Sequence, residues 1–198
     1  MFKITLEILP EEKIAEFADE LLAYEDPTEA YEKLDRFMTP YQRNMHENDE
    51  DHRFDNTPYY MRDIKVVYEI YPKLFKVYCV LEARRNFYYD ENKNLSAGQV
   101  INHYVTDRYN FIHEGESAAI LEKDFEKYLA SRGITEDEYF TEYLANCLMQ
   151  EYSIIAQMLD TCEPFCNKSD ILKYIRHQNY IEHTAREIVT ESNVYALV

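Results

Sequence analysis

The clearest structural signal in the chain is one long helix over residues 135–160, TEDEYFTEYLANCLMQEYSIIAQMLD. Thr135 and Glu138 have the spacing of a capping box, in which each side chain binds a backbone N–H of the first helical turn. Apolar side chains then recur at the spacing of one helical face, with polar side chains on the other side. Such a helix spans roughly 37 Å at 1.5 Å per residue, so we expect the other elements to pack against it.

Alternating apolar residues outside this helix predict a small antiparallel sheet of three or four strands. Residues 2–8, 64–70 and 75–83 alternate between apolar and polar side chains, and Tyr71-Pro72-Lys73 suits a hairpin connection. Residues 97–112 fit two interpretations. Ser96 and Gln99 resemble a capping box that would open a helix, but the abundance of Val, Ile, Tyr and Thr favours a strand. We favour the strand.

Further helices are predicted at 11–24, at 27–38 with a stop at Thr39-Pro40, at 116–131 with Gly133 as its C-cap, and at 169–192. Residues 41–57 show no periodicity and are interpreted as a long loop. The expected fold class is therefore α+β: a small antiparallel sheet packed against helices, with a helical C-terminal half. A chain of 198 residues can form one buried core, so we expect a single domain, 1–198, with the sheet in 1–112 and helices in 113–198.

Charge restricts the partners of this protein. Its 38 acidic residues outnumber its 21 Lys and Arg, which gives a formal net charge of −17. The excess lies in residues 1–57 and 113–168, whereas residues 58–112 are close to neutral. Nucleic acids and anionic membranes are bound by Lys and Arg that displace counterions. We therefore expect neither direct nucleic-acid binding nor membrane binding.

The four cysteines and the N-terminal residues indicate a cytoplasmic protein. Four cysteines are too few for a disulfide scaffold in a chain of this size, and Cys79 and Cys147 lie in apolar patterns that suit small buried side chains. The first residues do not resemble a signal peptide, and the sequence lacks a run of roughly 18 uncharged apolar residues that could cross a membrane.

Glycine content excludes several classes of enzyme. The chain contains 3 glycines, Gly98, Gly115 and Gly133. Walker loops, dinucleotide fingerprints and nucleophile elbows each need glycines at short fixed spacings. We exclude the common nucleotide enzymes and α/β-hydrolases, and we predict neither a cofactor nor catalytic residues.

Two stretches contain metal-ligand residue types. Cys162, Cys166, His177 and His183 resemble the ligand order of a two-Cys two-His zinc finger over about 22 residues, with a shorter middle spacing. Positions six apart on a continuous helix point about 120° apart, so the two histidines could share a metal only if the helix broke near Asn179. Residues 46–52, HENDEDH, lack the glycine and terminal glutamate of a calcium loop. We favour a solvated acidic loop, a cysteine pair in a turn and two surface histidines, with metal binding as the alternative.

These observations favour a non-enzymatic protein that binds a partner protein with a basic surface. Many basic clefts in cells hold nucleic acid, so an inhibitor that mimics nucleic acid, of the phage or mobile-element anti-defence type, would have this composition. The expected contact residues are Asp49, Glu50, Asp51, Glu136, Asp137, Glu138 and Glu142. The alternatives are a small metal-assisted enzyme or zinc-stabilised domain, which would use the Cys/His residues or the acidic loop, and a charge that only maintains solubility. The 19 tyrosines leave room for a homodimer.

Overall fold

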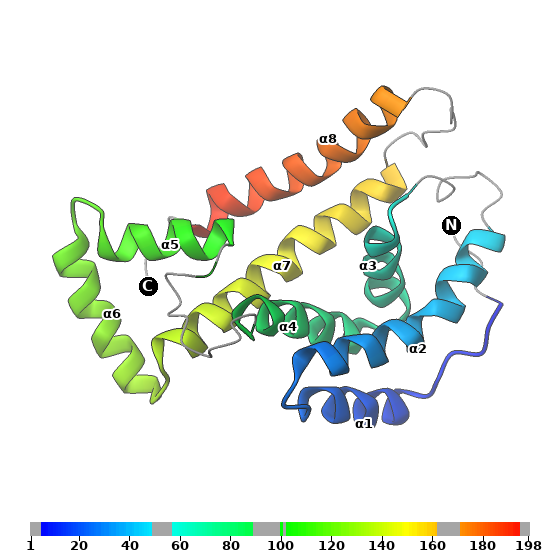
Figure 1. Ribbon diagram of the computed structural model, residues 1–198, viewed down its shortest axis with the longest axis horizontal. Helices are drawn as coiled ribbons and strands as arrows, with labels where there is room; N and C mark the ends of the chain where they lie inside the picture. The colour runs from blue at the N-terminus through cyan, green and yellow to red at the C-terminus, as the bar shows by residue number, and fades with distance from the viewer. Residues whose placement is uncertain (1–4, 49–56, 89–99, 101, 162–170, 195–198) are drawn as a thin grey trace.

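The computed structural model describes residues 5–48, 57–88, 100, 102–161 and 171–194, and every regular element within these ranges is a helix (Figure 1). The elements are α1 (Glu11–Leu22), α2 (Pro27–Glu47), α3 (Tyr59–Ile70), α4 (Pro72–Tyr88), α5 (His103–His113), α6 (Ala118–Arg132), α7 (Glu136–Thr161), α8 (Ile171–Val189) and the π-helical turn η2 (Thr190–Val194). The predicted α+β class is wrong, because the described residues contain no strand.

The predicted hairpin is replaced by α3 and α4. Each helix contains runs of consecutive buried residues, and such runs obscure the single apolar stripe that identifies a helix in a sequence. Its β-branched and aromatic residues then resemble a strand. The buried residues of this pair are Met61, Asp63, Ile64, Lys65, Val66 and Val67 on α3, and Leu74, Phe75, Val77, Tyr78, Cys79, Leu81 and Ala83 on α4.

Proline marks the start of each of the first four helices. Pro10 and Pro58 are the N-cap residues of α1 and α3, and Pro27 and Pro72 are the first residues of α2 and α4. The fixed φ of proline suits the first helical turn, where the missing N–H has no intrahelical partner. Pro72 therefore begins a helix where we predicted a hairpin turn.

The other two predicted strands are also wrong where the structure describes them. Residues 5–10 precede α1 without regular structure, and residues 103–113 form α5. The Asn102 side chain caps α5 by accepting hydrogen bonds from the N–H groups of Tyr104 at 3.1 Å and Val105 at 3.4 Å. The capping box proposed at Ser96 and Gln99 lies outside the described residues.

Helix α2 continues through the predicted stop at Pro40 and ends at Glu47. Met38, Tyr41 and Met45 remain buried on either side of the proline. Burial of this continuing stripe offsets the lost backbone hydrogen bond and the steric cost of proline inside a helix. The predicted loop is therefore helical in its first part, and residues 49–56 lie outside the described ranges.

The signals around the longest helix are confirmed. Thr135 N donates to Glu138 Oε2 at 2.7 Å, and Glu138 N donates to Thr135 Oγ1 at 3.2 Å, which completes the capping box. Gly133 ends α6 with a φ of 65°, in the left-handed region that glycine adopts without strain. Cys79 and Cys147 are free and buried, as expected.

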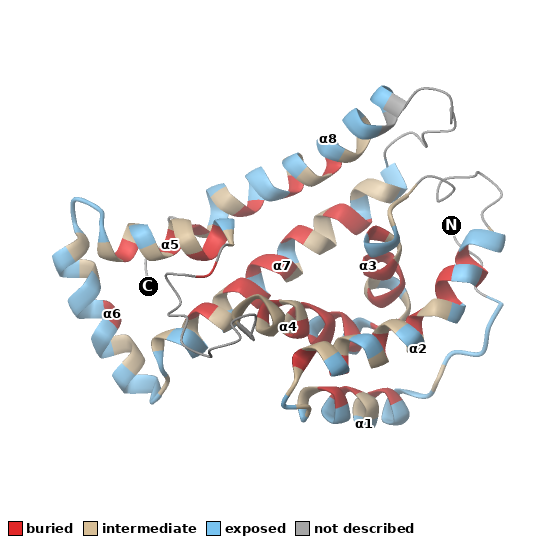
Figure 2. Cartoon of the chain, in the orientation of Figure 1, coloured by how far each residue is buried: buried red, intermediate tan, exposed pale blue. Residues whose placement is uncertain are grey.

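Helix α7 lies at the centre of the molecule and contacts α3, α4, α5 and α8 (Figure 1). The buried residues concentrate along α3, α4 and α7, whereas α6 is largely exposed (Figure 2). A second, smaller apolar cluster of Met61, Ile155, Ile181 and Ala185 joins α8 to α3 and α7. Among the described helices, none combines the length and the hydropathy that a membrane crossing requires.

Candidate functional site

The first candidate site is an acidic surface on α1 and α2. Glu12, Glu16 and Asp19 recur every three or four residues, so they lie along one side of α1. All three are exposed, and none forms an ion pair with another described residue. Glu29 and Glu32 add two exposed carboxylates on the neighbouring helix α2. We call these five residues the α1–α2 acidic surface.

Ion pairs around α1 involve other carboxylates, and none within the described ranges neutralises this surface. Lys33 of α2 binds Glu20, and the ammonium group also lies 5.7 Å from the ring centre of Phe17. Lys73 of α4 binds Glu11, with 2.8 Å between Nζ and Oε1. These pairs join α1 to its neighbours. In the part of the chain that the structure describes, no Lys or Arg pairs with the outward row on α1.

The predicted contact residues at the start of α7 are brought together, but much of their charge is engaged within the chain. Glu138 serves the capping box, and its hydrogen bond from Thr135 N lowers the pKa of the Glu138 carboxyl. Glu142 Oε2 lies 3.1 Å from Arg132 Nη2, and Glu136 Oε1 lies 3.7 Å from His113 Nε2. Asp137 is exposed beside them.

The acidic loop was predicted from the sequence but is not described by the structure, whereas the α1–α2 acidic surface is described but was not predicted. Asp49, Glu50 and Asp51 lie outside the described residues, so their position relative to α7 stays untested. Sequence reasoning missed the α1–α2 acidic surface, although the three- and four-residue spacing of Glu12, Glu16 and Asp19 was a usable signal.

The Cys/His residues are only partly described. His177 and His183 lie six residues apart on α8, which runs without a break from Ile171 to Val189. His183 Nδ1 lies 3.3 Å from Glu187 Oε1. Cys162 and Cys166 fall outside the described ranges, and within those ranges no group of three or more His, Cys, Asp or Glu side chains could hold a metal ion. The zinc alternative therefore stays a prediction that elemental analysis can test.

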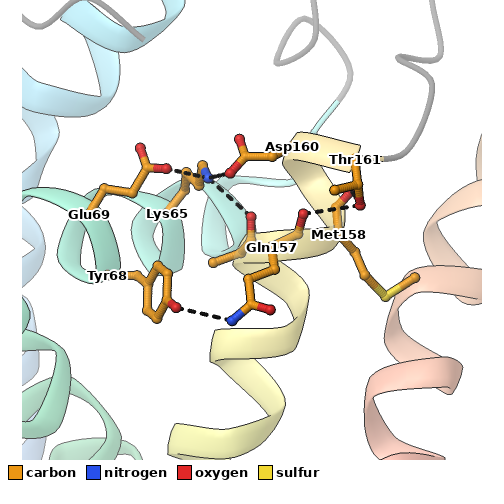
Figure 3. Close-up of polar contacts among 8 residues, drawn as sticks. Lys65, Tyr68, Glu69, Gln157, Met158, Asp160 and Thr161 are labelled. Atoms are coloured by element: carbon orange, nitrogen blue, oxygen red, sulfur yellow. Dashed lines mark hydrogen bonds and ion pairs between the residues drawn. The ribbon is translucent and has the colours of Figure 1, made fainter. Parts of the chain in front are cut away.

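Lys65 forms a buried polar junction between α3 and the end of α7 (Figure 3). Its Nζ donates to Ala156 O at 3.0 Å and lies 2.5 Å from both Asp160 Oδ2 and Glu69 Oε1. A cation near a helix C-terminus is favourable because it faces the negative end of the helix dipole. An ammonium group has three N–H donors, and these three acceptors explain its burial, so we interpret Lys65 as structural.

Asp63 is a buried carboxyl in an unfavourable environment. The residue is 5% exposed, and its Oδ1 atom is buried without a hydrogen-bond partner among the described residues. Burial, followed by the nearby carboxylates of Asp35 and Glu82, raises the pKa of Asp63 to about 7, while Arg62 opposes the shift. The Asp63 carboxyl therefore changes its protonation near neutral pH.

The second candidate site is a cleft of about 380 Å³ between α3, α4, α5, α7 and α8. Its volume falls within the range of small-molecule sites. Its lining is largely polar and aromatic, and contains Tyr60, Glu82, Asn86, Asn102, His103, Tyr104, Leu148, Glu151, Tyr152, Ile155, Glu182 and Arg186.

Hydrogen bonds and ion pairs fix the carboxylates of this cleft. Tyr104 Oη donates to Glu151 Oε2 at 2.7 Å, and Arg186 Nη2 lies 3.6 Å from Glu151 Oε1. Burial and the Glu151 charge raise the pKa of the Tyr104 phenol, so it remains a donor at neutral pH. Tyr60 Oη donates to Glu182 Oε1.

Comparison with known proteins yields no relative. No family model, curated protein or solved structure matches the chain. Function has to be inferred from the acidic surface and the cleft.

Proposed function

We propose that this protein is a non-enzymatic binder of another protein. It acts as an inhibitor that mimics nucleic acid, of the phage or mobile-element anti-defence type, and it occupies a basic cleft of a nucleic-acid enzyme. The observation that carries the proposal is the exposed row of Glu12, Glu16 and Asp19 on α1, which forms no ion pair with a described residue, together with the exposed Glu29 and Glu32 on α2, a helix that contacts α1.

The physical basis is charge presented on a rigid support. Proteins bind the nucleic-acid backbone through Lys and Arg that neutralise phosphates, largely without reading sequence. Carboxylates at fixed positions can engage the same cations. The inner face of α1 is anchored by Ile14, Ala18 and Leu21, which are 3%, 8% and 0% exposed. Because the row is already ordered, binding does not incur the cost of folding a flexible acidic segment.

The contact residues expected at the start of α7 have a secondary role in this proposal. Glu142 and Glu136 already face Arg132 and His113. A partner would have to displace the Arg132 guanidinium from Glu142 and the His113 ring from Glu136, whereas Glu12, Glu16 and Asp19 form no such contact with a described residue. We therefore rank the α1–α2 acidic surface above the α7 residues.

The experiment is a pull-down from an extract of the source cell, followed by competition with duplex DNA for each retained protein. The test variant neutralises the α1 row through Glu12→Gln, Glu16→Gln and Asp19→Asn. A matched control neutralises three exposed carboxylates elsewhere, through Glu114→Gln, Glu116→Gln and Glu126→Gln. Both variants change the net charge equally, so general charge effects cancel.

We expect the wild type and the control variant to retain and inhibit a nucleic-acid enzyme. Added duplex DNA or salt should release this enzyme from both. The α1 variant should bind it at least about tenfold more weakly, because charge–charge contacts at interfaces contribute energies of that order or more. Equal binding by both variants, or a retained protein whose nucleic-acid site stays accessible, would contradict the proposal.

A further inference from the structure

We infer that the cleft between α3, α4, α5, α7 and α8 binds a small organic cation, an aliphatic compound with ammonium groups. None of the residues that line this cleft belongs to α1 or α2. The inference therefore goes beyond the proposed inhibitor function and does not depend on it.

The charge of the lining selects a cation. Glu82 of α4, Glu151 of α7 and Glu182 of α8 place carboxylates on three sides of the cleft, and Arg186 is the one Lys or Arg in the lining. His103 faces Asp107, with 3.3 Å between Nε2 and Oδ2. The lining thus has an excess of negative charge, which a cationic ligand would neutralise.

Glu182 is the carboxylate that most needs a cation. Arg85 lies 3.1 Å from Glu82, and Arg186 lies 3.6 Å from Glu151. Glu182 instead accepts a hydrogen bond from the uncharged phenol of Tyr60, and forms no ion pair with a described residue. A ligand ammonium beside Glu182 would gain a charge-assisted contact without breaking an existing ion pair.

The walls also favour an organic cation. Tyr60, Tyr104 and Tyr152 contribute aromatic rings, and burial raises the pKa of the Tyr152 phenol well above its usual value, so this ring stays neutral. The face of an aromatic ring attracts ammonium groups, whereas Leu148 and Ile155 supply apolar contacts for a carbon chain. The side chains within the described residues do not form a metal site.

An anionic ligand fits this cleft less well. The N-terminus of α5 opens into the lining at Asn102, but two of the N–H groups that could bind an anion, those of Tyr104 and Val105, already donate to the Asn102 side chain. Arg186 is committed to Glu151, whose side chain is only 6% exposed. An anion would therefore have to compete with the Asn102 side chain for two N–H groups and with Glu151 for Arg186.

The experiment titrates diaminobutane into the full chain at low ionic strength and follows binding by calorimetry. Butanediol, which has the same carbon chain without charge, and succinate, which has the opposite charge, are the ligand controls. Glu182→Gln keeps an oxygen for the Tyr60 hydrogen bond while removing the charge. The matched control is Glu187→Gln on the same helix, which is exposed and lies outside the lining.

We expect saturable binding of diaminobutane, with no binding of butanediol or succinate. Glu182→Gln should weaken the affinity by up to about fivefold, as expected for a partly exposed charge pair, and Glu187→Gln should leave it unchanged. Absence of diaminobutane binding by a folded wild-type chain would overturn the inference. Equal binding of butanediol, binding of succinate, or equal losses in the two variants would do the same.

Discussion

The buried contacts of Lys65 should stabilise the junction between α3 and α7. Glu69 and Asp160 are 33% and 48% exposed, so water can hydrate their carboxylates if the ammonium is removed, whereas the Ala156 carbonyl would lose a buried partner. We expect Lys65→Met to lower the free energy of unfolding by about 2–3 kcal/mol, below the cost of breaking a fully buried ion pair. Urea denaturation measures this loss.

The control for Lys65 is Lys73→Met. The Lys73 side chain is 50% exposed and pairs with Glu11, which is 79% exposed. Exposed pairs contribute about 0–1 kcal/mol. Equal losses in the two variants would show that the contacts of Lys65 carry no special stability.

Asp63 should make stability depend on pH. Its pKa is about 7 in the folded state, above the value of about 3.9 expected in the unfolded chain. The folded state therefore binds more protons between these values. The contribution of the Asp63 carboxyl to the free energy of unfolding is fully present below about pH 4, and it is lost as pH rises towards 7.

Asp63→Asn should remove this dependence. As pH rises from 5 to 8, we expect the free energy of unfolding of the wild type to fall relative to that of the variant, by a few kcal/mol at most. Each unit of pKa shift corresponds to about 1.4 kcal/mol. Guanidinium denaturation at both pH values measures the difference. An exposed control, Asp124→Asn, should follow the wild type at both. If Asp63→Asn also follows the wild type, the Asp63 carboxyl is not the group that titrates.

The predictability of each helix depended on whether one of its faces reaches solvent. In α7, Glu142, Asn146 and Gln150 are exposed opposite the buried Leu144 and Leu148, so the period of the pattern was visible. Helix α4 lacks such a contrast because it contacts α1, α2, α3 and α7. In the sequence, Pro72 at the start of α4 was the one signal for a helix rather than a strand. The run of β-branched and aromatic side chains that follows favoured a strand more strongly.

Pro40 gives a prediction about α2. A proline inside a helix removes one backbone hydrogen bond and clashes with the carbonyl four residues earlier. Pro40 is exposed, so replacing it should leave the buried stripe of α2 intact. We expect Pro40→Ala to raise the free energy of unfolding by about 1–3 kcal/mol, as measured by thermal denaturation.

The comparison variant is Pro10→Ala, at the N-cap of α1, where proline displaces no intrahelical hydrogen bond. It should change stability far less than Pro40→Ala. A loss of stability in Pro40→Ala would mean that a bend at Pro40 is needed to place Tyr41 in the core.

Across the whole molecule, stability should be unevenly distributed. Helix α6 has 15 residues, of which Phe125 alone is buried. Phe125 packs 4.8 Å from the ring centre of Tyr139, and this contact joins α6 to α7. Segments with few buried contacts open locally at low cost.

We expect backbone amides of α6 to exchange with deuterium much faster than those of α4, as followed by mass spectrometry of peptides. Phe125→Ala should accelerate exchange in α6 while leaving α4 unchanged. Equal protection of the two helices in the wild type would contradict this distribution.

Tertiary structure also explains which parts of the candidate sites could be foreseen. Acidic charge is a property of composition, so an acidic binding surface could be expected from the sequence, although its position on α1 and α2 was missed. The cleft could not be foreseen. Tyr60, Glu82, Glu151 and Glu182 lie on four helices and meet only through packing, and no short motif connects them.

The central place of α7 has a consequence for the chain during its synthesis. Helix α4 packs against α7, yet about 50 residues separate the end of α4 from the start of α7. At translation rates of about 5–20 residues per second, the apolar side of α4 remains exposed for roughly 3–10 s before synthesis of α7 begins. Ribosome-bound chains that stop at Arg132 should be cut by protease within α4, and full-length chains should resist. Protease resistance of chains that stop at Arg132 would show that α1–α4 form a folded core without α7. If these chains are cut, the nascent chain has to avoid aggregation until α7 is synthesised.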